Sequence, residues 1–156
     1  MPAFESGDLR LAESDAIAQF VAEAGPCAGP LLGHSTAERA RIRQWTCFAE
    51  NEVYGPMLAV VLWRAGIRAY DADTEAQGAQ ALWTALGVVE RQLADGREFL
   101  VAERRTMADL SLAGSLYWAW MHYLDEAARE KIPRTVAWYC RTVDDLKEVF
   151  GEGPLH

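Results

Sequence analysis

The segment from Leu110 to Leu124 carries apolar residues on nearly every side of the helix that its spacing predicts. One stripe consists of Leu110, Ala113, Tyr117, Trp120 and Leu124, and a second consists of Leu112, Leu116 and Ala119. Few polar positions precede His122. A helix that is apolar nearly all round lies at the centre of a domain. The chain is therefore predicted to fold as a helical bundle built around this segment.

Further segments repeat apolar residues at three- and four-residue spacing, which also predicts helices. The central helix has a capping box at its start, in which Thr106 caps the helix and Asp109 bonds back to the cap amide. The other predicted limits are a start at Ser14, a start after Ser35 or Thr36 with a kink or stop at Pro56, an end at Asp95-Gly96 and a start at Pro133. The fold class is mainly α.

Residues 25–33 contain three glycines and two prolines in nine positions, which makes this stretch the best candidate linker. Before it, short apolar runs flank Ser6-Gly7-Asp8 and predict a two-stranded hairpin. We therefore divide the chain into residues 1–25, with two strands and a helix, a linker at 26–33 and an all-helical domain at 34–156.

Charge and composition exclude several classes of protein. The 23 acidic and 15 basic residues give a net charge of -8, which repels a phosphate backbone, so we expect no nucleic-acid partner. No apolar run reaches the roughly 20 residues of a membrane span, and no signal-peptide pattern opens the chain. Three widely spaced cysteines fit neither a zinc site nor a disulfide framework. We expect a cytoplasmic protein without a metal.

The clearest candidate binding site lies where the hairpin delivers Ser14 to the start of a helix. Free amides and the positive end of the helix dipole attract a carboxylate there. Glu13, the preceding residue, can pair with an ammonium group. A ligand with an α-amino acid end would satisfy both charges. The alternative is that Ser14 only caps the helix, which is the commonest use of such a serine.

Four motifs together resemble those of glutathione transferases. They are Pro-Ala-Phe-Glu at residues 2–5, Glu-Ser-x-Ala-Ile at 13–17, Phe-Leu-Val-Ala-Glu at 99–103 and Thr-x-Ala-Asp-Leu at 106–110. The resemblance implies an all-helical bundle of the glutathione transferase C-terminal type, preceded by a partial thioredoxin-like ββα unit. It also implies glutathione as the cofactor. Its cysteinyl unit would pair with the backbone at a cis-proline turn formed by Pro2 and Ala3, and its γ-glutamyl end would lie at Glu13 and Ser14.

The resemblance also points to an electrophile pocket on the helix that follows Ser35. Its candidate residues are Trp45, Phe48, Asn51, Glu52 and Tyr54. The alternative is that Trp45 and Phe48 belong to the domain core while Asn51 and Glu52 face solvent. In the family, the residue that activates the thiol precedes the cis-proline turn, so no catalytic residue is assigned. We expect either a fragment or shortened form of a longer protein, or another chain that covers the first strand.

Two functions follow from this resemblance. The first is a transferase that conjugates glutathione to an apolar electrophile or uses it to isomerise a double bond, in fungal secondary metabolism. The second is a non-catalytic interaction module, because Gln44-Trp45-x-x-Phe48-Ala49 and the end of the chain resemble the transferase-like domain of the elongation factor gamma subunit. A homodimer is implied by the family's usual assembly.

Overall fold

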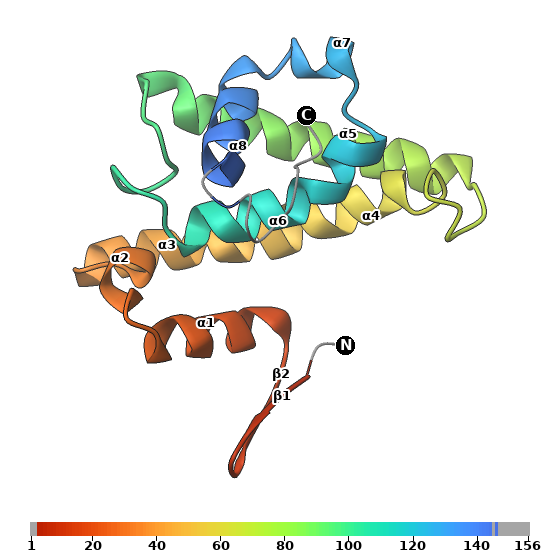
Figure 1. Ribbon diagram of the computed structural model, residues 1–156. Helices are drawn as coiled ribbons and strands as arrows, with labels where there is room; N and C mark the ends of the chain where they lie inside the picture. The colour runs from red at the N-terminus through yellow and green to blue at the C-terminus, as the bar shows by residue number, and fades with distance from the viewer. Residues whose placement is uncertain (1–2, 145, 147–156) are drawn as a thin grey trace.

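The computed structural model describes residues 3–144 and 146, and it is mainly helical (Figure 1). A hairpin opens the chain, with strands β1 (Ala3–Ser6) and β2 (Leu9–Ala12). The helices are α1 (Ser14–Ala24), α2 (Ala28–Leu32), α3 (Thr36–Phe48), the π-helix η1 (Ala49–Tyr54), α4 (Gly55–Val61), α5 (Ala72–Gln92), the 3₁₀ turn η2 (Leu93–Asp95), α6 (Met107–His122), α7 (Glu126–Arg129) and α8 (Pro133–Asp144).

Helix α6 lies at the centre of the bundle, as its apolar circumference predicts. It packs against α3, η1, α4 and α8. Leu112, Leu116, Ala119 and Trp120 are buried along its length. The predicted capping box at its start is present, and the Thr106 amide donates to the Asp109 carboxylate over 2.9 Å.

The N-terminal hairpin and α1 form a small unit of their own beside the bundle (Figure 1). The strands pair antiparallel, with Ser6 opposite Leu9 across a two-residue turn. Gly7 occupies that turn with a φ of 58°, which suits a glycine. The predicted hairpin is therefore confirmed, and the rings of Phe4 and Phe20, 5.4 Å apart, hold it to α1.

The stretch predicted as a linker contains a short helix, α2, which its glycine and proline content did not indicate. Gly33 follows it with a φ of 99°, and a Cβ there would meet the backbone nitrogen of Arg39 at 3.0 Å. The breakers thus end α2 and turn the chain into α3. The division into domains at this stretch stays a prediction.

The long helix after Ser35 does not stop at Pro56. Proline has no amide hydrogen and its ring collides with the carbonyl four residues earlier. The chain widens into η1 just before Pro56 and then continues as α4. π-Helical turns within longer helices are frequent at functional sites. The turn η1 forms part of the cleft described next.

Candidate functional site

A cleft of about 880 Å³ separates the N-terminal unit from the bundle. Helix α1 and the turn after it form one wall, and the other comes from α3, η1 and α6. We call it the α1–α6 cleft. Its residues on the bundle side are Thr46, Ala49, Glu50, Tyr54, Met107, Leu110, Ser111, Gly114 and Ser115. Its residues on the other side include Glu13, Ser14, Asp15, Ala18, Val21, Ala22 and Leu31.

The start of α1 opens into this cleft without a side-chain cap. Ser14 is the first residue of the helix, and the cap position belongs to Glu13, whose carbonyl accepts from the Ile17 amide over 3.0 Å. The expectation that the Ser14 hydroxyl caps the helix is wrong, because a capping residue must lie just outside the helical dihedrals. The exposed Ser14 hydroxyl and the first amides of α1 are therefore not engaged by a cap.

Glu13 holds an unusual backbone conformation at this point. Its φ is 71° and its ψ is 120°, and it is the one residue other than glycine with a positive φ in the described part of the chain. Such conformations cost free energy and tend to occur at functional sites. The turn places Glu13 and Ser14 together at the rim of the cleft.

The other two residues predicted to bind glutathione lie elsewhere. Ala3 is exposed and pairs with Ala12 at the end of the hairpin, and it does not line the cleft. Pro2 lies outside the described residues. The structure thus brings Glu13 and Ser14 together at the cleft, while the role given to Pro2 and Ala3 stays a prediction.

Of the five residues predicted for the electrophile pocket, Tyr54 lines the cleft. Trp45 is 7% exposed in the core and meets the Phe48 ring edge-on at 5.1 Å. Asn51 donates to the Cys47 carbonyl over 2.8 Å, and Glu52 is exposed away from the cleft lining. Trp45 is thus buried in the core and Phe48 packs against it, while Asn51 and Glu52 are exposed. These positions are the ones that the alternative interpretation describes.

Two sets of cleft residues were missed by the sequence analysis. Thr46 and Glu50 precede the predicted Tyr54 at four-residue spacing, one position along from the core stripe, and this offset is a usable signal. Ser111, Gly114 and Ser115 are the small residues on one side of the otherwise apolar central helix. They leave space where neighbouring positions carry large side chains.

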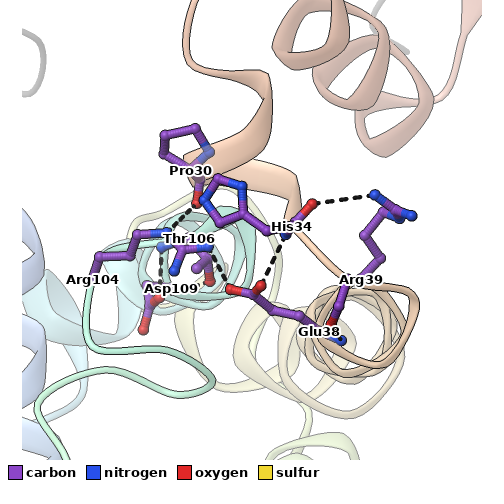
Figure 2. A network of polar contacts seen from close by, with 9 residues as sticks. Pro30, His34, Glu38, Arg39, Arg104, Thr106 and Asp109 are labelled. Atoms are coloured by element: carbon purple, nitrogen blue, oxygen red, sulfur yellow. Dashed lines mark hydrogen bonds and ion pairs between the residues drawn. The ribbon is translucent and has the colours of Figure 1, made fainter.

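A polar network ties α2 to the bundle (Figure 2). The Arg104 guanidinium donates to the Pro30 carbonyl over 2.9 Å and pairs with Glu38. Glu38 also accepts from the His34 amide over 2.9 Å, and mainly through this bond its carboxyl pKa is lowered from the usual value. Together these contacts join the segment before α6, helix α2 and the first turn of α3.

In the described residues, no three or more histidine, cysteine, aspartate or glutamate side chains gather where they could hold a metal ion. None of the described helices combines the length and the hydropathy that crossing a bilayer requires.

Comparison with known proteins agrees with this architecture. Residues 71–141 match the family model described as glutathione S-transferase, C-terminal domain. A glutathione S-transferase-like protein of Aspergillus aculeatus is 55% identical over 99% of this chain and 75% of its own length. The glutathione S-transferase-like protein LUC7 of Fusarium sp is 49% identical over 97% of this chain and 70% of its own length. The chain belongs to the glutathione S-transferase family.

Similarity extends to elongation factor 1-gamma. Elongation factor 1-gamma-A of Xenopus laevis is 32% identical over 99% of this chain, which spans 35% of that protein. Among solved structures, the GST-like domain of elongation factor 1-gamma from Saccharomyces cerevisiae superposes with a TM-score of 0.88. The match covers 98% of this chain and 73% of that one at 19% identity, so it shows a shared fold.

Proposed function

We propose that the chain binds glutathione at the start of α1 and acts on an apolar electrophile held in the α1–α6 cleft. The reaction is conjugation or glutathione-dependent isomerisation of a double bond, by a cytoplasmic homodimer in fungal secondary metabolism. The observation that carries this proposal is the uncapped, exposed start of α1 beside Glu13 and Ser14, at the rim of a largely apolar cavity.

The start of α1 suits the γ-glutamyl end of glutathione. The first amides of an eleven-residue helix and the Ser14 hydroxyl are donors for its α-carboxylate. The Glu13 carboxylate, next in sequence, complements its α-ammonium group. Both charges of one amino acid end are thereby matched within two residues.

The cleft places the electrophile next to that end. In conjugation, the glutathione sulfur forms a bond to an electrophilic carbon and a leaving group departs or a proton is gained. In isomerisation, the sulfur adds, a carbon–carbon bond rotates, and elimination restores the double bond and free glutathione. Both start from the thiolate. The thiol-activating group is not assigned to a described residue.

Retention on immobilised glutathione tests the binding site directly. We expect Ser14→Ala and Glu13→Ala each to weaken binding by about 1 to 3 kcal/mol, since each removes a partner of a charged group. Ser6→Ala and Glu5→Ala, which lie in the hairpin and do not line the cleft, serve as controls and should bind like the parent. Binding that survives both Ser14→Ala and Glu13→Ala defeats the site assignment.

The alternative is a non-catalytic interaction module. It is favoured by the 32% identity to elongation factor 1-gamma-A along nearly the whole chain. Turnover of a simple aryl halide electrophile with glutathione separates the two functions. The enzyme proposal expects turnover that falls in Ser14→Ala, whereas the interaction module expects none from a correctly folded protein.

A further inference from the structure

The α1–α6 cleft carries charge of one sign at its rim. Its lining includes three carboxylates, those of Glu13, Asp15 and Glu50, and no arginine, lysine or histidine among the described residues. Most of the remaining surface is apolar, and its other polar groups are mainly hydroxyls such as those of Ser111 and Ser115. A ligand in this cleft therefore lies on an apolar wall beneath a negative rim.

None of the three carboxylates forms an ion pair with an arginine in the described part of the chain. Arg39 and Arg43 line an adjacent cavity that shares the same three acidic residues. Yet the ion pairs found within residues 3–144 and 146 involve none of the three. In addition, Asp15 Oδ2 is shielded from solvent and has no hydrogen-bond partner in the described chain. An acceptor of this kind is stabilised by a donor or a positive charge nearby.

From this arrangement we infer that the cleft selects apolar electrophiles that are neutral or positively charged and discriminates against anionic ones of the same shape. The inference rests on the proposed function, because it takes the cleft to be the electrophile site. A carboxylate or phosphate on the substrate would lie close to like charges, whereas an amine or a hydrogen-bond donor would be attracted to them.

Three naphthalene ligands that differ in one group test this directly: 1-naphthylmethylamine, 1-naphthylmethanol and 1-naphthoate. We expect calorimetry at low salt to rank the amine first and the carboxylate last, with at least about a five-fold difference between them. Raising the salt to about 0.5 M should narrow the difference, since salt screens partly exposed charges. Equal or tighter binding of the carboxylate overturns the inference.

Two variants show whether the carboxylates of the cleft cause the preference for the amine. Glu50→Gln should reduce the preference for the amine by about two- to five-fold. Glu23→Gln removes an equal charge from an exposed position on α1 that does not line the cleft, and it should leave the preference unchanged. An equal response of both variants would mean that net charge, and not the cleft, sets the order, which also overturns the inference.

Gly114→Phe shows whether the ligands enter the cleft. A Cβ at Gly114 meets no atom within 4 Å, so a phenyl ring there is expected to fill the cleft without disturbing α6. Binding of all three ligands should fall at least about ten-fold, a factor worth about 1.4 kcal/mol. Unchanged binding in this variant, or no binding of any ligand to the parent protein, rejects the inference.

The same proteins are then tested on immobilised glutathione. Retention on glutathione without a charge preference among the three ligands defeats the inference alone. A charge preference without retention on glutathione defeats the proposed function alone.

Discussion

The Asp109 carboxylate accepts hydrogen bonds from several separate segments of the chain. It is fully buried, and its Oδ1 accepts from the Leu100 amide and from Trp138 Nε1, each over 2.9 Å. Its Oδ2 accepts from the amide and the hydroxyl of Thr106, over 2.9 and 3.0 Å. The carboxylate thus fixes the start of α6, the loop before it and helix α8 together.

Replacing this carboxylate should be costly. Asp109→Ala leaves several buried donors without an acceptor, and we expect a loss of at least about 3 kcal/mol in the free energy of unfolding. Trp138→Phe keeps most of the ring and removes one donor, so it should cost about 1 to 2 kcal/mol. Urea denaturation measures both, and a Trp138→Phe effect as large as that of Asp109→Ala would contradict this account.

At the scale of elements, the crossing of α4 and α5 depends on one glycine. A Cβ at Gly78 would lie 2.5 Å from the Ala59 Cβ and 3.2 Å from the Pro56 carbonyl oxygen. Neither atom is the end of a flexible side chain, so the two helices would have to move apart. Gly87 lies on the same helix, and a Cβ there meets the flexible Arg91 Nη1 at 3.5 Å.

Replacing each of the two glycines by alanine should therefore change the free energy of unfolding in opposite directions. Gly78→Ala is expected to destabilise the protein by about 1 to 3 kcal/mol through overpacking. Gly87→Ala is expected to stabilise it by up to about 1 kcal/mol, because alanine is the better helix former. Thermal unfolding compares the two, and a stabilising Gly78→Ala would show that the helix crossing is looser than described.

At the scale of the whole molecule, the Arg104 network joins α2, the helix that follows the N-terminal unit, to the bundle (Figure 2). Helix α1 packs on α2 and the hairpin, and Arg104 and Glu38 hold the α2 segment to α3. The pKa of Glu38 is lowered, so its contribution is present above the usual carboxyl range and is lost as the pH falls through the lowered pKa. The network is complete at neutral pH.

Loss of Arg104 should therefore loosen one wall of the cleft. In Arg104→Gln we expect faster amide exchange in residues 28–32 and weaker retention on glutathione, with the exchange of α6 unchanged. Arg97→Gln is the matched control, because Arg97 pairs with Asp95 of η2 and donates to the Leu100 carbonyl, and these hydrogen bonds reach neither α2 nor α3. Hydrogen exchange that is unaltered at α2 in Arg104→Gln would show that other contacts position the N-terminal unit.

Local sequence patterns correctly predicted the turns and helix limits that are set by residues close together in the chain. The hairpin, the helix start after Ser35, the box at Thr106, the end at Gly96 and the start at Pro133 all agree with the structure. The Ser14 cap does not, because the positive φ of Glu13 moves the cap position back by one residue. Nothing in the local composition indicates that conformation.

The sequence by itself determined the helical bundle, its central helix and its family, because periodicity, caps and motifs act over short stretches of chain. Only the tertiary structure decided which side chains face the cleft. The π-helical turn before Pro56 places Glu50 and Tyr54 there while Asn51 and Glu52 lie outside, and the packing of α1 opposite α6 brings Asp15 to the same cavity as Ser111. Those positions depend on contacts between residues far apart in sequence, which no local pattern records.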